Sequence, residues 1–255
     1  MRVAAIQHDI VWEDRDATLA RVAPMVAGAV TAGAELIVLP EMFAVGFSMA
    51  TAQLAEPPGG PTTAWLAQAA VSLGVWIGGS LPERAAGAQR PTNTFVLAGP
   101  DGTLHRYAKR HPFGYGGEHR YYDAGDQAVT VVIDGVRLSL AICYDLRFAD
   151  LFWTLAPRTD AYLVVANWPA ARRAHWTALL MARAIENQAY VVGVNRVGTA
   201  GAGRDVEHCG DTCIIDPMGE VLASAADKES VVSADIDPAI VTGIRARFPF
   251  LADRA

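Results

Sequence analysis

The sequence predicts an α/β fold in which two mixed β-sheets pack together and helices cover their outer faces. Short runs of continuous apolar residues alternate with helical stretches near both ends of the chain, which is typical of buried strands with covering helices. Hairpin signals in the middle of the chain are too frequent for a doubly wound parallel sheet. Of the 255 residues, 52% are hydrophobic, which is enough for one large domain or two small ones.

The N-terminal part of the chain alternates strands and helices. Residues 2–8 and 35–41 are short apolar runs that indicate buried strands. Between them, residues 16–33 repeat apolar side chains at helical spacing up to a glycine. A second helix is predicted over residues 61–73, because a proline opens this segment and a glycine follows it.

The middle of the chain favours antiparallel strands. Residues 75–81 and 92–99 indicate strands, and a Pro-Asp-Gly-Thr turn leads from the second of them into residues 104–109. Residues 128–143 contain two strands around an Asp-Gly pair, which is a strong signal for a tight hairpin. We therefore expect hairpin connections here rather than helical crossovers.

The C-terminal half returns to the order strand, helix, strand. Its predicted elements are a short helix over 146–156, a strand over 161–167, a helix over 172–189, a strand over 189–198, a hairpin over 211–225 and a closing strand over 229–237. Together with the N-terminal elements, these segments supply strands for two sheets and helices for both outer faces.

Charge and composition exclude several classes of function. The net charge is −6 and no basic cluster of five or more residues occurs, so no nucleic-acid partner is expected. No run of roughly 18 to 20 apolar residues predicts a membrane span, so no membrane partner is expected either. Three cysteines form a sparse, odd set, which favours a reducing compartment and makes the cytoplasm the default location.

Three titratable residues end three predicted strands, where the sites of α/β proteins commonly form. Glu41, Lys109 and Cys143 are each unremarkable alone, since a strand end is often only the first solvated residue. Together they form a complete set for acyl transfer: a base, an electrostatic stabiliser and a nucleophile. A Cys–His arrangement remains possible because several histidines are present, although none lies in a protease-like context.

Six blocks of sequence carry a resemblance to a known family. They are "LIVLPEMFAVGFSM" (36–49), "YAKRHPF" (107–113), "GEHRYY" (117–122), "LSLAICYDLRFADLF" (138–152), "NWPAARRAHWTALLMARAIENQAYVVGVNRVG" (167–198) and "GDTCIIDPMGEVL" (210–222). In this order they resemble the signature blocks of the carbon–nitrogen hydrolase (nitrilase) superfamily. The "PEMF", "NWPAAR" and "MARAIENQ" pieces most resemble its omega-amidase branch.

The resemblance implies a four-layer αββα sandwich. It covers nearly the whole chain, so residues 1–255 are expected to form a single carbon–nitrogen hydrolase domain. Members of the family commonly form dimers, which implies a homodimer here. The C-terminal tail, residues 238–255, resembles a segment that often crosses to the partner subunit, and its apolar residues would suit an interface or a fold-back on the same subunit.

The resemblance also implies the catalytic roles. Glu41 matches the general base, Lys109 the catalytic lysine and Cys143 the nucleophile, while Glu118 matches a second glutamate near the lysine. The backbone N–H of Tyr144 and the ammonium of Lys109 would then hold the oxyanion. No cofactor and no metal are implied, and the pair Cys209 and Cys213 beside His208 has too few ligands for a typical zinc site.

Candidate substrate contacts follow another strand end. Trp168 lies there, and either Arg172 or Arg173 would suit a substrate carboxylate, since guanidinium groups bind carboxylates in bidentate fashion. Phe43 and Phe47 are candidates for the pocket wall, and as loop aromatics they would equally suit the core or a dimer contact.

Two further expectations concern loops beside the site. The family's usual "KRHLF" is "KRHPF" here and "GYGG" follows, so the loop that carries Glu118 is altered, and Tyr115 within it is a further candidate for substrate contact. Asp145 and Arg147 are expected to form a buried pair that fixes the turn after the nucleophile.

The predicted function is hydrolysis of a small ω-amide, such as 2-oxoglutaramate or 2-oxosuccinamate, to a carboxylate and ammonia through a cysteine thioester. Nitrilase and N-carbamoyl amino acid hydrolase are alternatives with the same chemistry. Tyr144 favours an amide over a nitrile, because nitrilase-like sequences typically have Trp after the nucleophile. A catalytically silent binding protein is a third alternative, which the intact Glu41, Lys109 and Cys143 disfavour.

Overall fold

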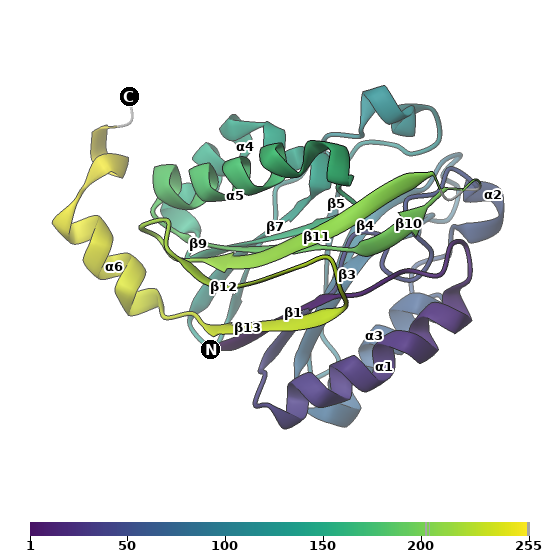
Figure 1. Ribbon diagram of the computed structural model, residues 1–255, viewed down its shortest axis with the longest axis horizontal. Helices are drawn as coiled ribbons and strands as arrows, with labels where there is room; N and C mark the ends of the chain where they lie inside the picture. Colours follow the sequence, from purple (N-terminus) through teal and green to yellow (C-terminus); the bar gives the residue numbers. More distant parts are fainter. Residues whose placement is uncertain (202, 204, 254–255) are drawn as a thin grey trace.

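The computed structural model describes residues 1–201, 203 and 205–253, and it shows two β-sheets packed face to face (Figure 1). The first sheet has, in spatial order, β13 (Ser230–Asp235), β1 (Arg2–Gln7), β2 (Leu36–Val38), β3 (Trp76–Glu83), β4 (Thr92–Ala98) and β5 (Leu104–Ala108). The second has β10 (Val197–Ala200), β11 (Val206–Ile215), β9 (Tyr190–Asn195), β8 (Ala161–Ala166), β7 (Val136–Ile142) and β6 (Thr130–Ile133), with β12 (Val221–Ala226) paired to β11. Both sheets mix parallel and antiparallel pairs.

Helices form the two outer layers. In Figure 1, α1 (Arg15–Thr31) and α3 (Pro61–Leu73) lie along the first sheet, and α4 (Ala149–Leu155) and α5 (Arg173–Asn187) lie along the second. Two further helices, α2 (Thr51–Leu54) and α6 (Pro238–Arg247), lie outside this arrangement. The predicted four-layer αββα sandwich is therefore confirmed.

Three apolar clusters fill the three interfaces between the layers. The cluster between the sheets includes Val38 and Leu140, from opposite sheets. A second cluster packs the buried side of α1 and α3 on the first sheet, and a third packs Trp176 and Leu180 of α5 on the second. Because the central strands are apolar on both faces, they appear in the sequence as continuous hydrophobic runs.

The boundary signals in the sequence work as expected in several elements. Pro61 begins α3, and Gly74 ends it in the left-handed conformation with φ 70°. Asp134 and Gly135 both have positive φ, 48° and 81°, which is the backbone of the tight turn predicted between β6 and β7. At the start of α1, the Asp14 carboxylate accepts a hydrogen bond from the Ala17 N–H at 3.0 Å.

Two predictions about elements were wrong. The strand predicted over 189–198 ends at Asn195 and a separate strand begins at Val197, because the buried Arg196 side chain occupies the junction and bonds to Asp9 at 2.6 Å. The helix predicted over 146–156 begins only at Ala149, because a 3₁₀ turn over Cys143–Arg147 precedes it.

The segment 238–253 contains a helix that the sequence analysis did not predict. In α6, Asp237 caps the first turn, and Arg245 donates hydrogen bonds to the carbonyls of Thr159 and Asn187. These contacts hold α6 against residues of the same chain, and Figure 1 shows it projecting at one end of the sandwich. Residues 254 and 255 of the predicted tail lie outside the described residues.

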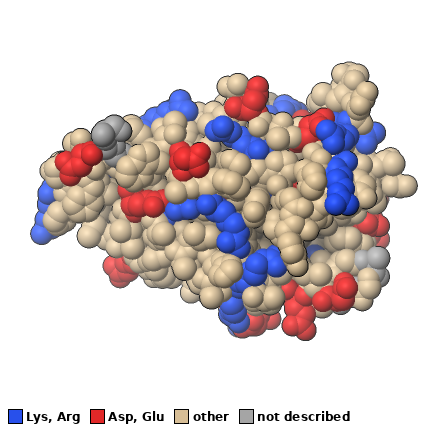
Figure 2. Space-filling view, turned by 90° about the horizontal axis from the view of Figure 1, so that it is seen from above, with Lys and Arg blue, Asp and Glu red and all other residues tan. Residues whose placement is uncertain are grey.

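The surface carries charges of both signs. Figure 2 shows Lys and Arg side chains interspersed with Asp and Glu on the face that carries α4 and α5. Within the described part of the chain, no helix is both long and apolar enough to cross a membrane.

Candidate active site

Glu41 lies in a tight bend just beyond the C-terminal end of β2. The next residue, Met42, has φ 41°, and its N–H donates to Ser80 Oγ at 2.9 Å, which fixes this left-handed turn. The Glu41 side chain is fully buried. Its Oε2 accepts a hydrogen bond from the backbone N–H of Asn167 at 2.8 Å, so a turn of the second sheet holds a carboxylate of the first.

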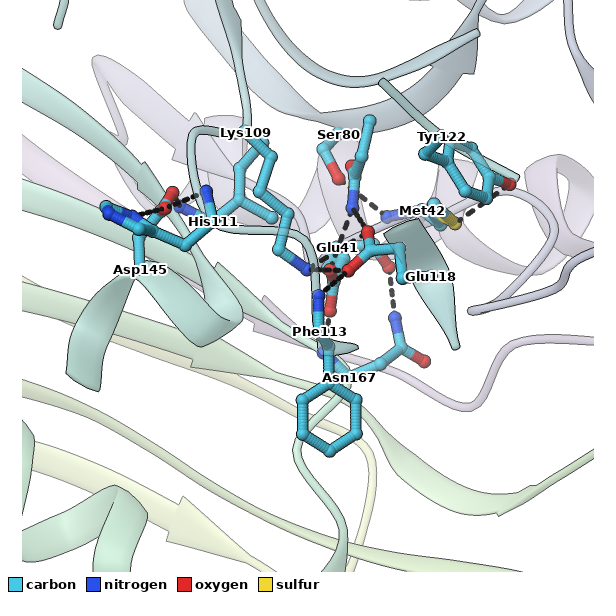
Figure 3. A network of polar contacts seen from close by, with 12 residues as sticks. Glu41, Met42, Ser80, Lys109, His111, Phe113, Glu118, Tyr122, Asp145 and Asn167 are labelled. Atoms are coloured by element: carbon cyan, nitrogen blue, oxygen red, sulfur yellow. Dashed lines mark hydrogen bonds and ion pairs between the residues drawn. The ribbon is translucent and has the colours of Figure 1, made fainter. Parts of the chain in front are cut away.

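Lys109 follows β5 and forms ion pairs with two buried glutamates (Figure 3). Its Nζ lies 2.8 Å from Glu41 Oε1 and 2.9 Å from Glu118 Oε2, and all three side chains are at most 1% exposed. Burial alone would lower the pKa of Lys109, but the charges of Glu118 and Glu41 outweigh it and raise this pKa well above its ordinary value. The ammonium therefore stays charged.

Glu118 is held in place by the altered loop. It lies on a short 3₁₀ turn, and its Oε2 also accepts a hydrogen bond from the backbone N–H of Phe113. Burial raises the pKa of Glu118, while the charge of Lys109 opposes that rise. The proline and glycines of "HPFGYGG" thus leave Glu118 beside the lysine.

Asn93 on β4 is a member of this cluster that the sequence analysis missed. Its Nδ2 donates to Glu41 Oε1 at 2.8 Å and to Glu118 Oε1 at 3.2 Å, so one amide bridges both carboxylates. Its carbonyl also accepts from the Lys109 N–H at 2.8 Å. No pattern in the sequence marks this asparagine, because its partners are distant along the chain.

Cys143 begins the turn after β7 with φ 47°, a left-handed conformation that is rare for a residue with a side chain. Burial, and next the negative charge of Glu41, raise the pKa of its thiol well above the usual range. The resting thiol is therefore protonated, and a base must remove its proton before or during nucleophilic attack.

Asp145 fixes the turn, but not through the partner that the sequence analysis expected. Its carboxylate accepts hydrogen bonds from the Ile142 N–H at 2.9 Å, the Tyr107 hydroxyl at 2.7 Å and the His111 N–H at 3.0 Å. The expected pair with Arg147 is wrong, because the Arg147 side chain turns to His175 instead, with Nη2 3.0 Å from Nδ1.

A cavity of about 130 Å³ lies over this cluster, and aromatic rings form much of its wall. Its lining residues are Trp12, Glu41, Phe47, Phe113, Cys143, Tyr144, Arg147, Asn167, Trp168, Pro169, Arg172, Ala200, Gly201, Val206 and His208. Burial lowers the pKa of His208 to about 4, so this histidine is neutral at pH 7. A cavity of this size admits only a small molecule.

The structure brings some of the predicted substrate contacts to this cavity. Trp168 and Arg172 line it, and so does Tyr144, which directly follows the nucleophile on the same turn. Arg173 does not line the cavity. Its guanidinium forms a bidentate ion pair with the Asp211 carboxylate, with N–O distances of 2.6 and 3.0 Å.

Two predicted contacts lie away from the cavity. Phe43 is fully buried in the core and packs against Trp65, with ring centroids 6.0 Å apart, and Phe47 forms the wall in its place. Tyr115 is 91% exposed on the loop surface and contacts Phe113 rather than the cavity. Both sit close in sequence to a lining residue, which is why sequence position alone misplaced them.

Sequence reasoning missed Trp12, which lines the cavity but lies outside the family blocks. Arg147 and Asn167 lie within those blocks, and they line the cavity as well. Among the described residues, no group of three or more His, Cys, Asp or Glu side chains could hold a metal ion. Cys209 instead donates to the Asp211 carboxylate at 3.2 Å.

Comparison with known proteins is consistent with this geometry. The chain is 39% identical to the omega-amidase YafV of Escherichia coli K12, over 99% of this chain and 96% of that protein. It is 36% identical to the 2-oxoglutaramate amidase of Bacillus subtilis, over 86% of this chain and 85% of that protein.

A solved structure shows the same fold. XC1258 from Xanthomonas campestris, a CN-hydrolase superfamily protein with an arsenic adduct in its active site, superimposes with a TM-score of 0.93. It is 36% identical in sequence, and the superposition covers 100% of this chain and 97% of that one. The family model for carbon–nitrogen hydrolases matches residues 2–246, and the chain belongs to this family.

Proposed function

We propose that the protein hydrolyses the ω-amide of a short 2-oxo dicarboxylic acid, such as 2-oxoglutaramate or 2-oxosuccinamate, to the carboxylate and ammonia. The observation that carries this proposal is the buried Lys109, paired with Glu41 and Glu118 beside a protonated thiol. The names of the relatives from E. coli and B. subtilis support the choice of an ω-amide.

The first half of the reaction forms a thioester. Glu41 takes the thiol proton while the sulfur of Cys143 attacks the amide carbon, and a tetrahedral intermediate results. Glu41 then gives the proton to the amide nitrogen, the carbon–nitrogen bond breaks and ammonia leaves. Because the Cys143 pKa is raised, proton removal must accompany attack, which makes Glu41 essential.

The second half of the reaction regenerates the thiol. Water attacks the thioester carbon as Glu41 accepts its proton, the carbon–sulfur bond breaks and the proton returns to the sulfur. The carboxylic acid product ionises as it leaves. Through both halves, Lys109 stabilises the negative oxygen, because its buried ammonium stays positively charged between Glu41 and Glu118. The backbone N–H of Tyr144 is the second proposed donor.

At the other end of the substrate, we propose that Arg172 binds the carboxylate. It lines the cavity, whereas Arg173 is paired with Asp211. A guanidinium is well suited to a planar carboxylate. This placement favours a substrate with a carboxylate over neutral amides and neutral nitriles. An N-carbamoyl amino acid also carries a carboxylate, so the substrate panel must separate it from an ω-amide.

The test is ammonia release from a panel of ω-amides of 2-oxo acids, nitriles and N-carbamoyl amino acids. We expect turnover of the 2-oxo ω-amides, none by Cys143→Ala, and a thioester mass on wild-type Cys143 after rapid quenching. Turnover confined to nitriles or carbamoyl substrates would refute the amide assignment. Silence across the panel from a folded protein would indicate a binding role.

We also propose that the protein works in the cytoplasm as a homodimer. Its three cysteines are free, which suits a reducing compartment. Ile185, Ile240 and Phe250 are 46, 46 and 56% exposed, and this apolar surface would suit an interface. Sedimentation analysis of the wild type and of Phe250→Asp would test the dimer, which should dissociate in the variant.

A further inference from the structure

Two guanidinium groups line the cavity without a carboxylate partner. Within the described residues, the Arg147 guanidinium makes one hydrogen bond, to His175, and the Arg172 guanidinium makes none. Neither forms an ion pair with a described residue, and Glu41 is the single acidic residue among those that line the cavity. A guanidinium has five N–H donors, so most donors of both groups are unused.

Aromatic rings hold both groups in place. The Arg147 guanidinium carbon lies 4.8 Å from the centroid of the Trp168 ring and 6.0 Å from that of Tyr144. The Arg172 guanidinium carbon lies 5.4 Å from the Phe113 ring centroid. Phe113 and Tyr144 meet edge to face, 5.0 Å apart, so a chain of rings links the two arginines. Such contacts position a guanidinium and leave its N–H donors free.

Arg147 is also tied to the nucleophile. Both residues belong to the 3₁₀ turn Cys143–Arg147, which the buried Asp145 fixes through hydrogen bonds to Ile142 and Tyr107. The distance between the Cys143 sulfur and the Arg147 Cα is therefore fixed by this turn. If the end of a substrate remote from its amide binds this guanidinium, the distance between the amide carbon and the Cys143 sulfur is set by the length of the substrate.

We propose that Arg147 is a specificity-determining residue, which together with Arg172 binds the carboxylate and the adjacent oxo oxygen at the end of the substrate remote from the amide. This inference rests on the proposed function and extends it. A 2-oxo acid offers three acceptor oxygens in one plane, which matches two guanidinium groups better than the two oxygens of a plain carboxylate do. The small cavity limits the substrate to a short chain.

The experiment compares three amides of similar length: 2-oxoglutaramate, glutaramate, which lacks the oxo group, and pentanamide, which also lacks the carboxylate. kcat and KM are measured for the wild type, Arg147→Met, Arg147→Lys and the control Arg158→Met. Arg158 is an exposed arginine that does not line the cavity.

For the wild type we expect kcat/KM to fall in the order 2-oxoglutaramate, glutaramate, pentanamide. Arg147→Met should lower kcat/KM for 2-oxoglutaramate by about 100-fold, mainly through KM, because a charge-assisted contact is lost. Its kcat/KM for pentanamide should stay within about threefold of the wild type. Arg147→Lys should recover part of the lost kcat/KM for 2-oxoglutaramate, since lysine restores the positive charge but not the bidentate geometry of the guanidinium. Arg158→Met should match the wild type on all three amides.

Two results would overturn the inference. In the first, Arg147→Met keeps the full preference for 2-oxoglutaramate over pentanamide. In the second, it loses both activities equally, which would indicate a structural role for Arg147. A wild type that hydrolyses pentanamide but neither acidic amide would instead refute the proposed function, so the two failures are distinguishable.

Discussion

The two ends of the active-site cavity are built in opposite ways. At the catalytic end, Glu41, Lys109 and Glu118 are buried, and each carboxylate accepts several hydrogen bonds. At the substrate end, Arg147 and Arg172 are partly exposed and held mainly by aromatic rings. The chemistry thus depends on a dry network with little freedom, whereas recognition depends on groups whose partners must come from the ligand.

Substitutions at the catalytic end should therefore affect folding, whereas substitutions at the substrate end should affect selectivity. Removing a member of a buried ionic network leaves an uncompensated charge or an unsatisfied donor, so stability and activity fall together. Removing a ring-stacked arginine leaves no buried charge behind, so the substrate preference changes while the fold persists.

Lys109→Met should have the largest effect. It leaves two buried glutamates without their cation, so we expect a loss of about 3–5 kcal/mol in unfolding free energy and turnover below about one ten-thousandth of the wild type. Lys228→Met is the matched control, since Lys228 is exposed and is the other lysine of the chain. Urea unfolding and ammonia release measure both effects, and a Lys109→Met protein as stable as the control would contradict the network.

The same variant has a pH signature. Burial already raises the pKa of Glu118, and loss of the lysine charge raises it further above the value in the unfolded chain. A carboxyl with a raised pKa in the folded state binds its proton more tightly when folded, so the variant gains stability as pH falls. The deficit relative to the wild type should therefore be smaller at pH 5 than at pH 8 in urea unfolding.

Glu41→Gln should lower turnover by about 10²–10⁴-fold, because it removes the proposed general base. It should also lower the pKa of the Cys143 thiol, since the Glu41 charge is one of the causes that raise this pKa. Iodoacetamide alkylation of Cys143, followed against pH by peptide mass spectrometry, measures that shift. An unchanged or higher thiol pKa in the variant would show that Glu41 does not act on the sulfur.

Asn93→Ala should have an intermediate effect. The bridging amide is lost, and two buried carboxylates each lose one donor, which costs about 1–3 kcal/mol. We expect kcat to fall by roughly 10- to 100-fold with a smaller change in KM, since Asn93 does not line the cavity. A rise in KM at constant kcat, seen in steady-state kinetics, would argue instead for a contact with the substrate.

Arg173→Met should have the smallest effect. It removes an exposed ion pair with Asp211, and such pairs contribute about 0–1 kcal/mol. Turnover of 2-oxoglutaramate should stay within about twofold, whereas Arg172→Met should raise KM by about tenfold or more. A reversal of these two results would show that Arg173, rather than Arg172, binds the substrate carboxylate.

The sequence was informative where the chain itself marks a residue. Glu41, Lys109 and Cys143 each end a predicted strand, so their positions are visible without any knowledge of tertiary contacts. The family motifs added Glu118. The alternation of elements predicted two packed sheets with outer helices, and the resemblance implied that these form an αββα sandwich. The chemical end of the cavity was therefore largely predictable.

The rest depends on contacts between distant segments. Asn93 joins the network because β4 lies beside β5, and Arg147 faces the cavity because Asp145 bonds to Tyr107 and His111 instead of to it. Tyr115 and Phe43 were placed by their neighbours along the chain, although a loop and a strand end rotate successive side chains to different sides. Residue type and spacing along the chain do not indicate which distant segments contact each other.

The scarcity of lysine has a practical consequence for handling the protein. Of its two lysines, Lys109 is 1% exposed and paired with two carboxylates, while Lys228 lies on the surface outside the cavity lining. The terminal amine of Met1 donates to the Ile236 carbonyl at 3.1 Å. An amine-reactive resin or dye should therefore couple mainly through Lys228, which would attach most molecules in one orientation with the cavity free.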